Sequence, residues 1–121
     1  MQRACLIIVE DDPDIRTDLA ELLKDEGYAV NTASNGAEAL QLLRQSQTPC
    51  LILLDLMMPV MSGWDFRAEQ LRDPRLAAIP VVLLSGVNDL PQHAAALRAA
   101  GYIRKPIALK SVLGVAEKYC C

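Results

Sequence analysis

Residues 7–15 read IIVEDDPDI, an apolar run that gives way to four acids within five residues. The run shows no polar alternation, which favours a strand covered on both faces of a parallel sheet. Asp12 followed by Pro13 is typical of a helix start, because Asp is favoured at the N-cap and Pro at the first helical position. Asp14 then lies in the first turn, where the helix dipole favours negative charge. Glu10 and Asp11 precede this cap, so the helix start does not explain them.

The same alternation of apolar runs and helical patterns continues along the chain. The expected strands cover 4–9, 28–33, 50–54, 80–84 and 101–104, and the expected helices cover about 15–26, 35–44, 64–72 and 90–99 and the chain from 109 onward. The order βαβαβαβαβα predicts an α/β fold, a doubly wound parallel sheet with helices on both faces. A length of 121 residues without a linker predicts one domain over residues 1–121.

Composition narrows the class of protein. Hydrophobic residues make up 52% of the chain and charged residues 22%, which fits a globular protein rather than a membrane protein. The net charge of −3 disfavours direct nucleic-acid binding. Eight of the fifteen acids lie at or before Glu26, whereas five of the Lys and Arg residues lie from residue 90 onward. A basic protein-contact surface would therefore come from the C-terminal quarter.

Four cysteines are present, namely Cys5, Cys50 and the pair Cys120-Cys121. Cys5 and Cys50 lie in apolar runs and are expected to behave as small buried hydrophobes. The spacing matches neither a disulfide framework nor a zinc site, and no signal peptide precedes it, so a reducing cytoplasm is expected. Prenylation of a terminal Cys-Cys lacks supporting motifs.

Polar groups follow the strands at one edge of the predicted sheet. Asp55 directly follows the expected strand 50–54. On its own it could be a structural acid or a solvated loop residue. Parallel strands carry their ligand sites beyond their carboxyl ends, so Asp55 is expected to meet Glu10 and Asp11. Three converging carboxylates need shifted pKa values or a cation. Hard oxygen ligands suit Mg²⁺, or Mn²⁺ by the same logic.

Two further strands end in groups that suit a phosphoryl group. Ser85 and Gly86 follow the run PVVLL, and Lys105 follows GYIR. Each has an ordinary explanation, because a serine often caps a turn and a lysine is often a solvated charge. Together with the acids they offer a carboxylate nucleophile, a cation cage, a hydroxyl and an ammonium, which is the set that phosphoryl transfer requires.

These motifs resemble those of response-regulator receiver domains, the phospho-acceptors of two-component signalling. The resemblance covers essentially the whole chain and rests on four stretches in the right order: VEDDPDIR (9–16), LLDLMMPVMSGWDF (53–66), IPVVLLSG (79–86) and GYIRKP (101–106). It implies the flavodoxin-like (βα)5 fold with strand order 2-1-3-4-5. Relative to common receivers, Glu10, Ser85-Gly86 and Ile107 are modest departures.

The resemblance also implies roles for the residues at the strand ends. Asp55 would be phosphorylated by a histidine kinase or a phosphotransfer protein. Asp11 would bind Mg²⁺ directly, Glu10 mostly through water, and the backbone carbonyl of Met57 would be a further ligand. Lys105 would pair with Asp55 and then with the phosphoryl group. The peptide bond between Lys105 and Pro106 would be cis.

The same resemblance implies a two-state switch. Ser85 would follow the phosphoryl oxygen, with Gly86 beside it, and Tyr102 would turn inward, although Tyr102 could instead be an ordinary strand residue. Met57 and Val87 occupy positions that influence attack by water in this family. Both are apolar, which predicts slow self-dephosphorylation.

Several alternatives compete with this interpretation. An aspartyl-phosphate phosphohydrolase would need an acid where Met57 stands, so no turnover of an external substrate is expected. A flavin binder would need a glycine- and hydroxyl-rich loop in place of the acidic one, and a degenerate receiver would act only as a docking module. His93 is expected to be an exposed helical residue and Trp64 a packing residue. If 121 residues is the natural length, the output would be contact with an unidentified protein partner, without direct nucleic-acid or membrane binding.

Overall fold

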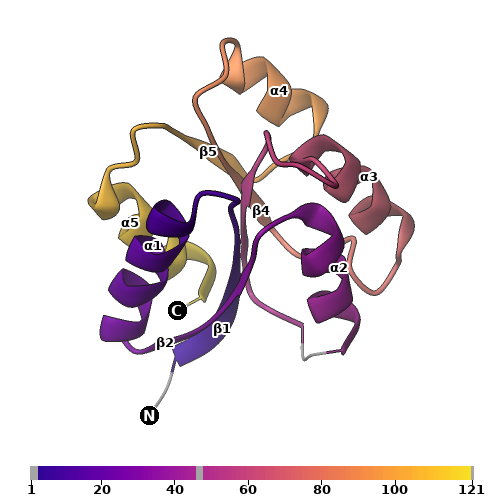
Figure 1. Ribbon diagram of the computed structural model, residues 1–121. Coiled ribbons are helices and arrows are strands. Elements are labelled where there is room, and N and C mark those ends of the chain that lie inside the picture. The colour runs from indigo at the N-terminus through magenta and orange to yellow at the C-terminus, as the bar shows by residue number, and fades with distance from the viewer. Residues whose placement is uncertain (1–2, 46–47, 121) are drawn as a thin grey trace.

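The structure is a computed structural model that describes residues 3–45 and 48–120. Five strands alternate with five helices (Figure 1). The strands are β1 (Arg3–Val9), β2 (Tyr28–Ala33), β3 (Ile52–Asp55), β4 (Val81–Ser85) and β5 (Gly101–Arg104). The helices are α1 (Pro13–Asp25), α2 (Gly36–Gln45), α3 (Gly63–Arg72), α4 (Leu90–Ala96) and α5 (Leu109–Cys120). None of the helices in the described ranges is long and apolar enough to cross a bilayer.

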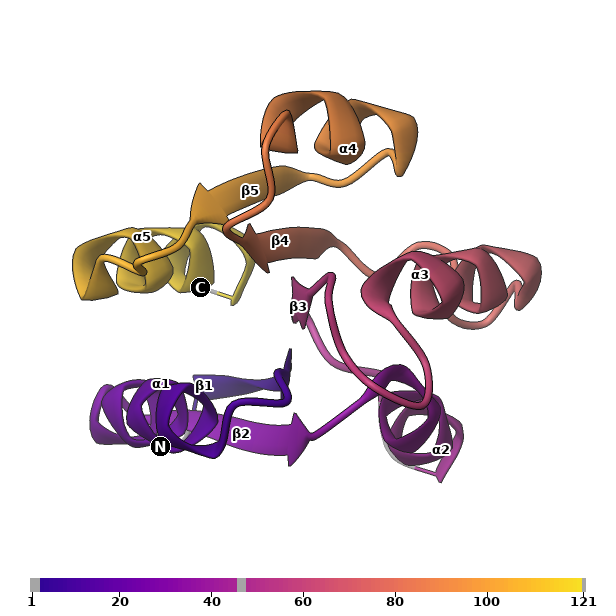
Figure 2. The same cartoon turned by 45° about the horizontal axis from the view of Figure 1, so that its top comes forward.

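All strand pairs are parallel, as the sequence predicted, and the sheet order is β2-β1-β3-β4-β5, as the family resemblance implied. Helices α1 and α5 lie on one side of the sheet and α2 and α3 on the other, as Figure 2 shows. The side chains divide accordingly into two apolar clusters. One joins the sheet to α2, α3 and α4, and the other joins it to α1 and α5. The central strands β3 and β4 are buried along their whole length, which explains their unbroken apolar sequence.

Helix α1 begins where the acidic stretch predicted. Asp12 is the N-cap, and its side chain accepts hydrogen bonds from the backbone N–H groups of Asp14 (2.9 Å) and Ile15 (3.2 Å). Pro13 occupies the first helical turn. Asp12 and the residues after it are therefore accounted for by the helix start, and Glu10 and Asp11 stay outside it.

Helix α4 ends earlier than the sequence predicted, at Ala96 rather than near residue 99. The buried guanidinium of Arg67 in α3 explains this boundary, because it donates to the carbonyls of Leu97 (2.9 Å) and Arg98 (2.9 Å) that follow the helix. Arg98 has a φ of 53°, a left-handed conformation of the kind that ends helices. Arg67 thus fixes the C-terminal end of α4 against α3.

The prediction for the cysteines is wrong. Cys50 and Cys120 form a disulfide across a sequence separation of 70 residues. The fold makes this pairing possible, because α5 packs its C-terminal end over the strand that follows Cys50. Cys5 is the free cysteine among the described residues, and both it and Cys50 are partly exposed rather than buried. Cys121 lies outside the described residues.

Candidate functional site

Three carboxylates meet at the carboxyl end of the sheet. Glu10 and Asp11 follow β1, Asp55 is the last residue of β3, and the pairing of these two strands places them side by side. One oxygen from each residue lies within 4.8 Å of the others. Glu10 and Asp55 are buried, at 0% and 3% exposure, and Asp11 is exposed. The predicted convergence of the acids is therefore present in the fold.

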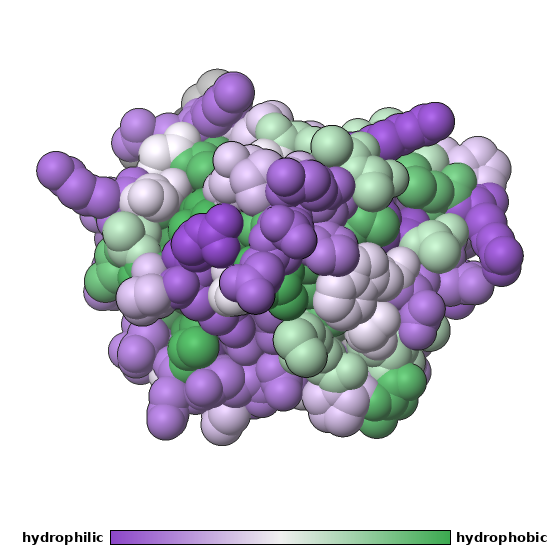
Figure 3. All heavy atoms as spheres, turned by 90° about the horizontal axis from the view of Figure 1, so that it is seen from above, coloured by the Kyte–Doolittle hydropathy of each residue, from purple (hydrophilic) through white to green (hydrophobic). Residues whose placement is uncertain are grey.

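The acids line a cavity of about 340 Å³. Its other lining residues are Asp12, Met57, Ser85, Gly86, Val87 and Lys105. Seen from above, hydrophilic side chains gather near the middle of this face and hydrophobic ones flank them (Figure 3). The cavity is large enough for an ion with water or a small anion, and it opens to solvent on the side where Asp11 is exposed.

Lys105 reaches into the acidic cluster from the end of β5. Its Nζ lies 3.1 Å from Glu10 Oε1, 3.0 Å from Glu10 Oε2 and 3.5 Å from Asp55 Oδ1. The ammonium thus pairs more closely with Glu10 than with Asp55, the partner that the family resemblance implied. The bond between Lys105 and Pro106 is cis, as the resemblance also implied.

Burial sets the electrostatics of Asp55. Burial first, and the charge of Glu10 second, raise the pKa of Asp55 to about 7, although Lys105 acts in the opposite direction. Burial alone would lower the pKa of Lys105, but its hydrogen bond to Glu10 and the charges of Asp55 and Glu10 raise that pKa above its usual value. The lysine is therefore a permanent cation, and the cluster holds more negative charge than one cation balances.

The unbalanced charge fits a divalent cation. Glu10 Oε2 has no hydrogen-bond partner among the described residues, although it is fully buried and Lys105 Nζ lies nearby. This one ammonium is shared by both oxygens of Glu10 and by Asp55, so a hard cation would add the positive charge that the buried carboxylates lack. With the oxygens of Asp11 and Asp55, Glu10 forms a donor set of the type that Mg²⁺ or Mn²⁺ binds.

The remaining predicted residues lie around or beside the cavity. Ser85 is buried, and its Oγ accepts a hydrogen bond from the backbone N–H of Val87 at 3.2 Å. Gly86 and Met57 line the opening, and the Met57 side chain is 64% exposed. Tyr102 is 46% exposed and is not among the residues that line the cavity.

Two residues that support the site were missed by the sequence analysis. Arg16 in α1 donates from Nη1 to the backbone carbonyl of Glu10 at 2.9 Å and, more weakly, to the backbone carbonyl of Asp11 at 3.5 Å. These bonds hold the acidic loop against the helix. Gly63 begins α3 directly against the end of β3: a Cβ there would lie 2.3 Å from the carbonyl oxygen of Asp55. Its N–H also donates to the carbonyl of Leu56 at 2.8 Å.

Comparison with known proteins agrees with this geometry. The family model described as "Response regulator receiver domain" matches residues 6–117. The chain belongs to the response-regulator receiver family. The five-stranded sheet order and the acidic edge described above are those expected of a receiver.

Individual relatives show how far the likeness extends. The receiver is 34% identical over 113 residues to the transcriptional regulatory protein PdtaR of Mycobacterium tuberculosis, covering 93% of this chain and 54% of PdtaR. It therefore spans about half the length of that relative. Chemotaxis protein CheY4 of Vibrio cholerae is 28% identical, with a TM-score of 0.87 and coverage of 97% and 98%. Response regulator TrrA of Thermotoga maritima, solved in complex with Mg²⁺ and BeF, is 28% identical, with a TM-score of 0.83 and coverage of 98% and 99%.

Proposed function

We propose that residues 1–121 form one phospho-accepting switch in which Asp55 receives a phosphoryl group from a histidine kinase or a histidine phosphotransfer protein. The observation that carries this proposal is the meeting of Glu10, Asp11 and Asp55 around one cavity, with the ammonium of Lys105 inside it. Membership of the receiver family supports the class of function.

Each side chain has a defined task in the proposed transfer. An oxygen of deprotonated Asp55 attacks the phosphorus of a phosphohistidine, the P–N bond breaks, and the leaving imidazole nitrogen takes up a proton. Lys105, which already pairs with the acids, neutralises phosphoryl oxygens as charge moves onto Asp55. Ser85 and Gly86 line the cavity beside the position where the transferred oxygens come to rest.

Glu10, Asp11, Asp55 and the backbone carbonyl of Met57 are the groups that would hold Mg²⁺, with Mn²⁺ as a substitute. When bound, the ion would offset the charge of the carboxylates and the phosphoryl oxygens. The buried, acid-rich donor set, which a single ammonium does not balance, supports this assignment, as does the complex of the related TrrA with Mg²⁺ and BeF.

The output follows from the residues beside the acceptor. Ser85 would exchange its bond with the N–H of Val87 for a phosphoryl oxygen, and Tyr102 would then turn inward from its exposed position. This change would alter the surface of α4, β5 and α5, which carries basic residues, and so control a protein partner rather than nucleic acid or a membrane. We place the protein in the cytoplasm, where ATP-derived phosphoryl groups are available.

The alternative is a docking module that works without phosphorylation, and one experiment separates the two. Purified protein is incubated with acetyl phosphate and Mg²⁺, and its intact mass is compared with that of Asp55→Asn. Asp65→Asn is the matched control, because Asp65 is an exposed acid in the first turn of α3. Wild type and Asp65→Asn gain one phosphoryl group and Asp55→Asn gains none. Equal labelling of Asp55→Asn removes Asp55 from its role, and no labelling of wild type favours the docking module.

A further inference from the structure

The Cys50–Cys120 pair lies at the amino end of β3, whereas the acidic cavity lies at the carboxyl end of the same strand. Cys50 precedes β3, where the strand enters the sheet, and Cys120 is the last residue of α5. Their Cα atoms are 5.5 Å apart, a spacing at which a disulfide forms without movement of the backbone. Val112 and Ala116 pack α5 in the same cluster independently of the bond, so we expect the two thiols to stay adjacent when it is reduced. The fold therefore places the two sulfurs where a bond between them can form.

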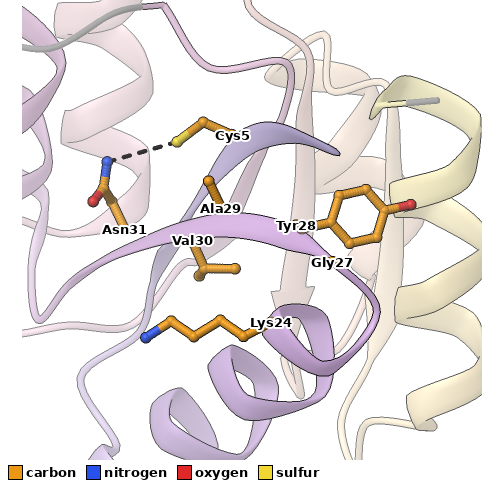
Figure 4. Close-up of a pocket in the computed structure, with 7 residues that line it drawn as sticks. All are labelled: Cys5, Lys24, Gly27, Tyr28, Ala29, Val30 and Asn31. Carbon is orange, nitrogen blue, oxygen red and sulfur yellow. Dashed lines mark hydrogen bonds between the residues drawn. The ribbon is translucent and has the colours of Figure 1, made fainter. Parts of the chain in front are cut away.

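Cys5 lies beside Cys50, but its side chain points away from the disulfide. The carbonyl of Cys5 accepts a hydrogen bond from the backbone N–H of Cys50 at 2.9 Å. Its thiol, however, is turned toward the Asn31 amide, which lies 3.6 Å away, whereas the Tyr28 ring points to the other side of the sheet (Figure 4). Cys120 packs in the same cluster as Tyr28. Cys5 is thus excluded from the pair by the direction of its side chain, and burial raises the pKa of its thiol.

The two paired cysteines differ in access. Cys50 is partly exposed and Cys120 is 2% exposed. A small-molecule disulfide such as oxidised glutathione can therefore reach Cys50 first. The Cys50 thiolate attacks one sulfur of the reagent and releases one reagent thiol. Cys120 then attacks the Cys50 sulfur of the mixed disulfide and releases the second. The protein loses two electrons, the reagent gains them, and the two protons leave on the released thiols.

The bond has a mechanical consequence for α5. The buried residues of this helix are Val112, Ala116 and Cys120, and an exposed glycine, Gly114, lies between the first two. The partly buried Leu113, Val115 and Tyr119 pack against the same cluster. Among the described residues, no ion pair links Lys110, Glu117 or Lys118 to the rest of the molecule. The last turn is therefore held by packing of Cys120 and the partly buried Tyr119 against this cluster and by the disulfide, and reduction leaves it held by packing alone.

We propose that Cys50 and Cys120 are a reversible thiol-modification site, oxidised by small-molecule disulfides, that fixes the C-terminal turn of α5 to the start of β3. The site gives the receiver a second chemical input on a helix of its proposed output surface. It stands independently of phosphorylation at Asp55.

The test compares the full chain reduced with a phosphine against the same chain oxidised with glutathione disulfide and freed of reagent. Free thiols are alkylated, and the peptides are mapped by mass spectrometry. Wild type, Cys5→Ser and Cys121→Ser are expected to lose two hydrogens and to link residues 50 and 120 within one chain, whereas Cys50→Ser and Cys120→Ser are not. Circular dichroism verifies that each variant is folded. Pairing through Cys5, or links between chains only, overturns the proposal.

Hydrogen exchange provides the second readout. Amides of residues 116–120 are expected to exchange at least about tenfold more slowly in the oxidised wild type than in the reduced one, because local opening of the last turn is restricted. In Cys50→Ser the two conditions give equal rates. Equal exchange in oxidised and reduced wild type would show that the bond does not anchor α5.

Discussion

Gly63 offers a sharp test of how the acceptor strand is supported. A Cβ at this position would lie 2.3 Å from the carbonyl oxygen of Asp55 and 2.7 Å from the Cα of Leu56, and both atoms are backbone. Neither can move aside as a flexible side chain would, so α3 or the end of β3 must shift by about an ångström to reach ordinary contact. Overpacking of this kind costs about 1–3 kcal/mol, and the rigidity of both partners places Gly63→Ala near the upper value.

Gly114 in α5 supplies a matched control, because the same substitution there should have the opposite sign. No atom lies within 4 Å of a Cβ built at Gly114. In the interior of an exposed helix, alanine is favoured over glycine by about 0.5–1 kcal/mol.

Thermal and urea unfolding of the metal-free protein measure both effects. With about 4 °C per kcal/mol for a domain of this size, Gly63→Ala lowers the Tm by about 12 °C and Gly114→Ala raises it by about 3 °C. The Gly63 variant should also accept phosphate from acetyl phosphate more slowly, since the shift displaces Asp55. A Tm of Gly63→Ala within about 2 °C of wild type would refute the close approach of α3 to the acceptor strand.

The remaining predictions concern charge, helix anchoring and phosphoryl lifetime. Burial raises the pKa of Asp55 from 3.8 to about 7, so the metal-free protein loses stability as the pH rises from about 4 through about 7. Asp55→Asn should therefore stabilise the protein by about 2–3 kcal/mol more at pH 8 than at pH 5 in urea unfolding, and a pH-independent difference would contradict the shift. Arg67→Met should lower the free energy of unfolding by about 3 kcal/mol, because it leaves the carbonyls beyond α4 unpaired. Arg72→Met, at an exposed ion pair with Glu69, should lower it by less than about 1 kcal/mol. Equal losses for the two variants in urea unfolding would argue against the anchoring role of Arg67. The apolar side chains of Met57 and Val87 beside the cavity predict a phosphoryl half-life of minutes or longer, measured by loss of label. Met57→Asn is expected to shorten this half-life several-fold. A half-life of seconds in wild type would count against the prediction.

Much of the fold could be predicted because the decisive patterns are local. The apolar run before Glu10 and the Asp12-Pro13 start specify a strand followed by a helix, and the structure confirms both within a residue or two. Parallel pairing of β1 with β3 then brings Asp55 to Glu10 and Asp11. The candidate site was accessible from the sequence for this reason: a parallel sheet puts the carboxyl ends of its strands on one side, and the strand order that the family resemblance implied makes β1 and β3 neighbours.

The features that were missed depend on distant contacts. Pairing of Cys50 with Cys120 requires knowledge of where α5 ends relative to β3, which no local pattern provides. The early end of α4 depends on Arg67, 31 residues before Arg98 in the chain. Gly63 looks like an ordinary residue at a helix start until the backbone of Asp55 is seen against it. In each case the three-dimensional neighbour, rather than the residue type, carries the information.

The identity of the phosphorylated side chain tests the central claim most directly. Protein labelled by acetyl phosphate in Mg²⁺ is reduced with borohydride, which converts an aspartyl phosphate to homoserine, and the modified residue is located by tandem mass spectrometry. Homoserine is expected at position 55, formed in Mg²⁺ and absent when the metal is chelated. Homoserine at position 11 or 12 instead, or equal labelling with and without Mg²⁺, would contradict it.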